Sequence, residues 1–147
     1  MRMKSRFAIL LGSLAVVLMG CTGMEHATTH DEPLENTYWK LTRVGDVTPV
    51  AVDNQREAHF VLHTEENRVA GSTGCNRLAG SYRLENDALS FGPLVTTRMA
   101  CLEGGDTEPA FLGALEATAT WQVEGQALTL RDESGAVVAQ FEAVHLY

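Results

Sequence analysis

The chain has 147 residues, a length that suits one domain with a single hydrophobic core. Hydrophobic residues make up 45% of it and charged residues 20%, as in ordinary globular proteins and unlike disordered ones. Its formal net charge of −8 argues against a nucleic-acid binder, which needs a basic face to neutralise phosphates.

The first twenty residues differ from the rest of the chain. They hold three basic residues, no acidic one and the apolar run Phe7–Met19. Thirteen helical residues span about 20 Å, less than the roughly 30 Å hydrocarbon core of a bilayer. We therefore expect residues 1–20 to be a secretory signal peptide. Without the three basic residues the formal net charge falls from −8 to −11.

The apolar run ends in Leu18-Met19-Gly20-Cys21, which resembles a bacterial lipobox. The resemblance implies cleavage before Cys21 and the attachment of palmitate-like acyl chains to it. Two or three such chains anchor a protein stably in a membrane. Similar lipoproteins without Asp after the cysteine usually reach the outer membrane, and here Thr22 follows. We expect an outer-membrane, lipid-anchored protein that faces the periplasm; the alternative is a plain signal peptide with an incidental cysteine.

Residues 21–36 are polar and have no apolar periodicity, so we expect a flexible tether there. The tether holds His26, His30, Asp31 and Glu32, which are candidate metal ligands. Nothing in a disordered segment preorganises them, so we expect solvated side chains and no metal.

From residue 37 apolar and polar residues alternate in short stretches separated by turn residues, as in antiparallel strands. The strands expected are residues 38–44, 58–63, 68–73, 81–84, 88–91, 120–123, 127–130 and 136–144. One helix is expected over residues 107–119, capped by Asp106 or Thr107, with Pro109 in its first turn. The predicted fold of residues 37–147 is α+β, mainly β: a small, strongly curved antiparallel sheet or partly open barrel with one helix packed on it.

The sequence contains few signals of catalysis. His59 and His63 have the spacing that serves zinc on a helix, but on a strand four residues span about 13 Å, too far for one ion. We expect two solvent-facing histidines and no metal or cofactor. Hydroxyls at residues 72–73 and 96–97 have no activating base nearby in the sequence. We therefore expect no enzyme, unless a pocket brings His59, Glu57 or Asp87 to a hydroxyl.

Cys75 and Cys101 remain once Cys21 is assigned to lipid. In an exported chain two remaining cysteines most simply form one disulfide. Free buried thiols and a reactive redox pair are the alternatives. Arg77 and Arg98, close in sequence to the two cysteines, are able to lower a thiol pKa.

Residues 74–80 (GCNRLAG) and 96–101 (TTRMAC) resemble the paired motifs of META-domain, HslJ-like proteins. A Trp-x-Leu opening at Trp39 and a Glu-x-x-Phe helix start at Glu108 agree with the resemblance. It implies a compact antiparallel β fold with a helix, often carried as a bacterial envelope lipoprotein. It also implies an association with stress response and brings no established reaction.

Five residues of these motifs are candidates for structure or recognition. Gly74 and Gly80 permit backbone conformations or close approaches that a Cβ forbids. Asn76 is able to turn its amide onto nearby backbone, and Arg98, like Arg77, brings five donors that brace carbonyls or a carboxylate. The two motifs together form either a structural corner or a ligand-recognition surface.

The function expected is a non-enzymatic, monomeric lipoprotein domain, held to the membrane by its lipid anchor. We expect it to serve envelope stress tolerance by binding a protein partner at an exposed sheet edge. The alternative is a carrier or pilot-like module that holds an apolar ligand or acyl chain in a partly open barrel. A cavity of about 300 Å³ or more favours the carrier.

Overall fold

The computed structural model describes residues 30–101 and 105–145. The predicted signal peptide, the predicted lipidation site Cys21 and the first part of the predicted tether lie outside the described residues. Within the part that is described, no helix is both long and apolar enough to cross a bilayer.

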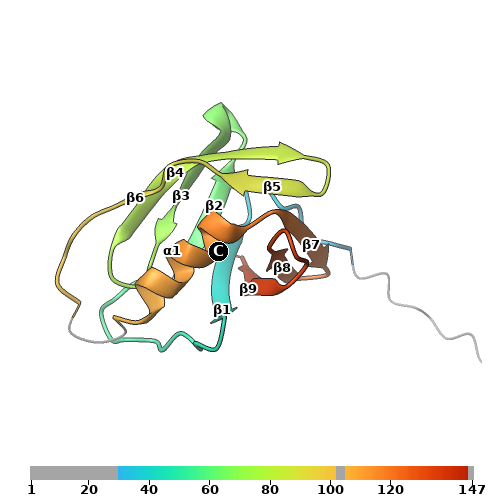
Figure 1. Cartoon of the computed structure of the whole chain (residues 1–147). Coiled ribbons are helices and arrows are strands. Elements are labelled where there is room, and N and C mark those ends of the chain that lie inside the picture. The colour runs from blue at the N-terminus through green and yellow to red at the C-terminus, as the bar shows by residue number, and fades with distance from the viewer. Residues whose placement is uncertain (1–29, 102–104, 146–147) are drawn as a thin grey trace, which may run out of the picture.

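Nine strands and one α-helix follow one another along the described chain (Figure 1). The strands are β1 (Tyr38–Val44), β2 (His59–His63), β3 (Arg68–Ser72), β4 (Arg77–Glu85), β5 (Ala88–Phe91), β6 (Val95–Thr96), β7 (Thr120–Glu124), β8 (Ala127–Arg131) and β9 (Val137–Val144). The helix is α1 (Thr107–Ala117), and the short 3₁₀ turn η1 (Glu65–Asn67) joins β2 to β3. The prediction of a mainly β chain with one helix is confirmed.

Eight of these strands close into an antiparallel barrel. Hydrogen bonding runs in the order β3–β2–β1–β9–β8–β7–β5–β4, and β3 also pairs with β4. The two-residue strand β6 pairs with β4. The join between β5 and β7 is short, with Ala88 opposite Thr120 as its ladder pair. The barrel expected as one of two alternatives is therefore present, and it is closed where a partly open one was expected.

The barrel is filled by its own side chains. Trp39, Phe60 and Phe141 point inward from β1, β2 and β9, and each is at most 2% exposed. The ring of Phe60 meets that of Phe141 edge to face, with centroids 4.9 Å apart. The helix α1 packs against β9, β1 and β5 (Figure 1). It adds the fully buried Phe111, whose ring centroid lies 5.9 Å from that of Phe141.

The helix is shorter than expected. It ends at Ala117 because Thr118 takes an extended conformation, with φ −62° and ψ 130°. The expected side-chain cap is also missing, since Asp106 occupies the N-cap position without a hydrogen bond from its side chain.

Part of the predicted tether belongs to the folded domain, so the predicted boundary at residue 37 is wrong. Leu34 is 5% exposed and joins the core, and its carbonyl accepts a 2.8 Å hydrogen bond from the Trp39 indole N–H. The amide of Asn36 donates to the Leu62 carbonyl. The sequence concealed this docking because one buried leucine in a polar stretch produces no periodicity.

A hydrogen bond between Tyr82 and Glu35 fastens the same segment. Tyr82 is 4% exposed and its hydroxyl donates to Glu35 Oε1. Burial, followed by the hydrogen bond to Glu35, raises the pKa of Tyr82 above its usual value. We expect Tyr82→Phe to lower the free energy of unfolding by about 1 kcal/mol, measured by urea denaturation. In a double-mutant cycle Glu35→Ala should couple to Tyr82→Phe; additive effects would show that this hydrogen bond does not hold the segment.

Candidate functional site

The two sequence motifs meet at one corner of the barrel, between the β3–β4 turn and the segment that follows β6. Gly74 has a φ of +98°, which favours glycine over residues with a Cβ. From Arg77 onward the first motif is already strand β4, where Leu78 pairs with Thr96 of the second motif. A Cβ at Gly80 would lie 2.7 Å from Leu94 Cδ2 and 2.9 Å from the Pro93 carbonyl oxygen. Both motif glycines therefore serve backbone geometry.

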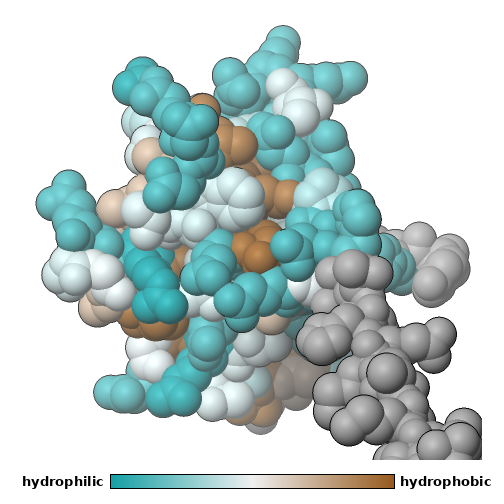
Figure 2. All heavy atoms as spheres, turned by 90° about the vertical axis from the view of Figure 1, so that its right-hand side faces the viewer, coloured by the Kyte–Doolittle hydropathy of each residue, from teal (hydrophilic) through white to brown (hydrophobic). Residues whose placement is uncertain are grey.

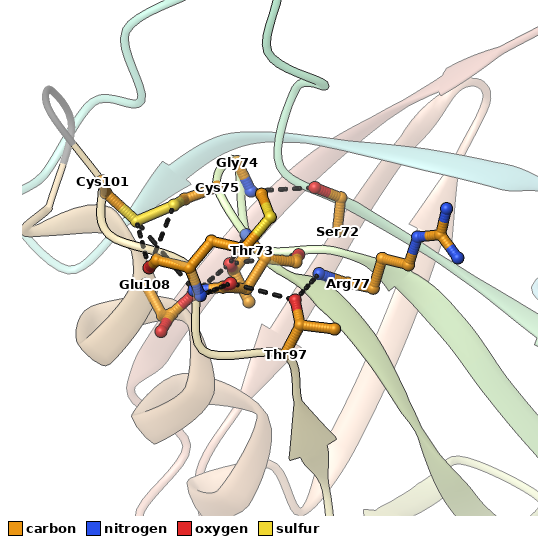
Figure 3. Close-up of a disulfide and its surroundings, with 10 residues drawn as sticks. Ser72, Thr73, Gly74, Cys75, Arg77, Thr97, Cys101 and Glu108 are labelled. Atoms are coloured by element: carbon orange, nitrogen blue, oxygen red, sulfur yellow. Dashed lines mark hydrogen bonds between the residues drawn. A yellow bond between two sulfur atoms is a disulfide. The ribbon is translucent and has the colours of Figure 1, made fainter.

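A disulfide joins the two motifs. It links Cys75 to Cys101, which are 26 residues apart in sequence and 5.8 Å apart between Cα atoms (Figure 3). Both cysteines are partly exposed. The bond fixes the turn after β3 to the chain segment that leads into α1.

Asn76 lies at the centre of the corner and is 3% exposed. Its side-chain oxygen accepts hydrogen bonds from Thr97 Oγ1 at 2.9 Å and from the Met99 amide at 2.7 Å. Its side-chain nitrogen donates to Glu108 Oε2 at 2.9 Å. One amide thus connects the β3–β4 turn, the segment after β6 and the first turn of α1.

Thr73 completes the network from the other side. Thr73 is 1% exposed, and its hydroxyl donates to Glu108 Oε2. The same hydroxyl accepts a 3.0 Å hydrogen bond from the backbone N–H of Asn76. Around the corner, the Arg77 amide donates to Thr97 Oγ1 and the Gly74 amide donates to Ser72 Oγ (Figure 3). Of the four hydroxyls considered as nucleophiles, those of Ser72, Thr73 and Thr97 are engaged in hydrogen bonds within this corner, and Thr96 belongs to the short strand β6.

The role of Glu108 was not foreseen, although its place at the helix start was. Glu108 Oε2 accepts hydrogen bonds from Asn76 and Thr73, which lie 32 and 35 residues earlier in the sequence. Nothing in the sequence around Glu108 predicts these contacts. Arg77 and Arg98 are exposed, and within the described chain neither guanidinium group makes an ion pair. The structure therefore contains no bracing contact from Arg98 to described residues.

His59 is not solvent-facing as predicted. It is 6% exposed, its ring stacks on that of Tyr38 with centroids 4.1 Å apart, and its Nδ1 lies 2.9 Å from the Glu57 carbonyl oxygen. Burial lowers the pKa of His59, against the opposing effects of that hydrogen bond and of the Glu57 charge. Burial also raises the pKa of Tyr38 to about 12, assisted by Glu57. The alternation in β2 does not predict the burial of His59, because the ring that covers it, Tyr38, lies on the neighbouring strand β1.

The buried His59 predicts a specific dependence of stability on pH. Its folded-state pKa is below the 6.5 of the unfolded chain, so the unfolded state binds more protons in that window. Stability should therefore fall as the pH drops below about 6.5, by at most about 1.4 kcal/mol per pH unit from this group. In urea titrations at several pH values, His59→Phe should flatten this dependence and His63→Gln should retain it. An unchanged slope in His59→Phe would contradict the assignment.

The groups that would indicate catalysis do not converge. Asp87 lies in the β4–β5 turn, apart from His59 in β2. Glu57 and Thr73 line a cleft of about 20 Å³, which is smaller than a substrate. No cluster of three or more metal-ligating side chains occurs among residues 30–101 and 105–145.

Solved structures share this fold. A protein from Burkholderia xenovorans, whose structure was determined by NMR, has a TM-score of 0.63 and 32% identity, covering 77% of this chain and 85% of its own. A second NMR structure has a TM-score of 0.58 at 22% identity, covering 74% of this chain and 90% of its own. A DUF4847 family protein from Bacteroides vulgatus has a TM-score of 0.52 at 11% identity, and the match covers 74% of this chain and 93% of its own. The last two are alike in fold alone.

A comparison with curated proteins finds no match. The META domain family model matches residues 32–145. This range includes the Cys75–Cys101 disulfide, all the barrel strands and the segment with Leu34 that packs into the core before β1. The chain therefore belongs to the META domain family.

Proposed function

We propose that this protein is a lipid-anchored, periplasm-facing outer-membrane lipoprotein whose META domain is not an enzyme and serves envelope stress tolerance by binding a protein partner. The signal-peptide pattern and Cys21 support the anchoring. The resemblance to HslJ-like proteins supports the stress role. The binding role is supported by the barrel, as follows.

The closed, filled barrel carries the binding proposal. Its interior is occupied by side chains such as Trp39 and Phe60, and the polar groups of the motifs bond to one another. What the domain offers to other molecules is then its outer surface. The face shown in Figure 2, on the side of β7, is mainly hydrophilic with small apolar patches between.

The same observation disfavours the carrier alternative. A carrier of acyl chains needs an apolar space inside the barrel, but Phe141 and Leu128 are at most 2% exposed within a continuous core. A cleft of about 360 Å³ lies between Arg43, Asp46 and β9, on the surface and with charged groups in its lining. A fatty-acid probe should therefore not bind delipidated mature protein.

Strand addition is disfavoured as the binding mode. It requires a sheet edge with unpaired backbone groups, and the pairing of β3 with β4 closes the ring. Of the strands described, β6 lies at the end of the order and has only two residues. Beside the single ladder pair that joins β5 to β7, parts of these two strand edges have no ladder partner, and strand addition is confined to them. Elsewhere a partner contacts side chains on the outer face of the barrel.

Two experiments test the proposal. Labelled acyl chains should appear on the wild-type protein in cells and vanish in Cys21→Ala; label that persists would refute the anchor. Crosslinking of the lipoprotein in its native envelope should capture the same partner repeatedly. If no reproducible partner is captured, the binding role is wrong.

A further inference from the structure

An apolar belt crosses the outer surface of the barrel. It consists of one outward-facing residue from each of six strands: Val144, Tyr38, Val61, Ala70, Ala79 and Val95. Strand register places Tyr38 opposite Val144, Val61 opposite Ala70, Ala70 opposite Ala79, and Ala79 opposite Val95. Tyr38 and Val61 line one surface cleft together with Val144, which joins the two halves of the belt.

The belt is most exposed toward its end on β4 and β6. Ala79 is exposed, Ala70 is half-buried, and Val95 at the end of the belt is 63% exposed. Five steps between neighbouring strands make the belt about 24 Å long, measured along the curved surface of the barrel. Apolar side chains at register-matched outward positions on six strands give a continuous stripe, where alternation on an antiparallel sheet ordinarily puts polar residues outside.

Basic side chains lie on both sides of this belt. On one side of the belt, two residues before Ala79 on β4, lies Arg77, opposite Ser72. On the other side, two residues before Ala70 on β3, lies Arg68, between His63 and Ser81. These rows lie about 6–7 Å from the belt on either side. On β2, β3, β4 and β6 the belt and these rows contain no acidic residue. On β9 the row beside the belt holds the exposed Glu142, opposite Lys40, and Glu32 lines the cleft with Tyr38, so the basic character belongs to the β2–β4 part of this face.

The two arginines are available to a partner. Arg68 and Arg77 are exposed, and neither makes an ion pair with a described carboxylate. Lys40, two residues along β1 from Tyr38, is by contrast paired with Glu57 at 3.1 Å. An interface with an apolar centre and arginines beside it has the composition of a protein-binding surface.

The geometry fits a helix. The belt lies on five of the eight barrel strands and on β6, so it curves round the barrel and a straight helix contacts only part of it. The stretch from Val61 to Ala79 crosses two strand steps, about 10 Å, which about two turns of α-helix span. The rows of basic residues are about 13 Å apart, close to the 10–12 Å diameter of a helix with its side chains. A helix with one apolar stripe would cover the stretch of the belt from Val61 to Ala79 while carboxylates at the edges of the stripe reach Arg68 and Arg77.

We infer that this face docks an amphipathic α-helix of a partner protein whose apolar stripe is edged by Asp or Glu. This inference rests on the proposed partner-binding function and specifies its surface and chemistry. An anionic membrane is a poorer occupant, since attraction to lipid headgroups needs a cluster of about 4–8 basic residues, and the chain beyond residue 20 has a formal net charge of −11.

The test uses the protein without its lipid and a synthetic 16-residue peptide with Leu at helical i, i+3, i+4 spacing and Glu beside it. The peptide should bind, and its NMR shift changes should concentrate at Val61, Ala70 and Ala79. The double variant Arg68→Glu with Arg77→Glu should weaken binding about tenfold or more. The matched double variant Gln122→Glu with Gln140→Glu, on the outer face of β7 and β9, should change it less than about twofold.

Several results would overturn the inference. A scrambled peptide without the apolar stripe, or one with Lys in place of Glu, should not bind; equal binding of either would refute it. Binding to phosphatidylglycerol vesicles in preference to the peptide would assign the face to a membrane. Thermal unfolding of each variant verifies that it is folded, and Ala79→Glu serves as a second belt variant.

In-envelope crosslinking separates this inference from the proposed function. A photoreactive residue at Ala79 should capture the partner, and one at Thr129, on the outer face of β8, should not. Capture from Thr129 alone would refute the docking face and leave the binding role intact. Capture from neither position, nor by general crosslinking, would refute the binding role itself.

Discussion

Asn76→Ala should destabilise the domain by about 3 kcal/mol and lower its melting temperature by about 10 °C. The substitution removes an acceptor used by Thr97 and Met99 and a donor used by Glu108, all around a side chain that is 3% exposed. The partners left behind lose hydrogen bonds in a partly buried site, which costs more than the bonds themselves contribute in net terms. Urea denaturation monitored by tryptophan fluorescence measures the loss.

Asn76→Asp distinguishes lost hydrogen bonds from lost packing. The new carboxylate keeps the shape and the acceptor but loses the N–H that donates to Glu108 at 2.9 Å. Two carboxylates at that distance repel, so we expect a large loss at pH 7 that is partly recovered at acidic pH, where one of them takes up a proton. Gln140→Ala, at an exposed position on β9, should have little effect. A loss in Asn76→Asp that does not vary with pH would point to packing instead.

Removal of the Cys75–Cys101 disulfide should cost about 3.5 kcal/mol. The bond closes a loop of 26 residues, and the loss of chain entropy in the unfolded state scales with the logarithm of that length. The double variant Cys75→Ser with Cys101→Ser should therefore unfold at clearly lower urea concentration than the oxidised wild type.

Reduction provides the matched control for this prediction. Wild-type protein in dithiothreitol should approach the stability of the double serine variant, and the variant should not respond to the reductant. A thiol titration of unfolded, unreduced mature protein should find no reactive thiol. Two reactive thiols, or a wild type as stable reduced as oxidised, would show that the bond is absent or without effect in solution.

Most strands were predictable because their local pattern and their environment agree. In β9, and in β1 as far as Leu41, alternate residues face the core, so a period of two in the sequence follows directly from the pleat of the strand. After Leu41 a register shift puts both Thr42 and Arg43 outside, and Val44 faces the core. The turn residues at 65–67 and 124–126 mark the ends of such runs. The helix was found through its 3.6-residue period, and only its last two residues were assigned wrongly.

The elements that were not predicted are those whose sequence pattern does not match the burial of their residues or is too short to recognise. The first half of β4 lies within the GCNRLAG motif, where Gly80 interrupts the alternation because Leu94 packs over it. The two residues of β6 are too few to show a period. In the candidate site, residue types pointed to Asn76 and the cysteines, but the contact with Glu108 depends on how α1 returns to the barrel.

The pairing of β1 with β9 has a consequence for how the chain acquires its structure during synthesis. Thr42 donates from β1 to the Gln140 carbonyl of β9, across 98 residues of sequence. The barrel thus cannot close until β9, its last strand, has been synthesised and pairs with β1 and β8. Contacts between residues so far apart in sequence make folding slow. The chain should therefore remain open until nearly all of it has been synthesised. Nascent chains that stop before residue 137 should therefore be digested by protease along their whole length.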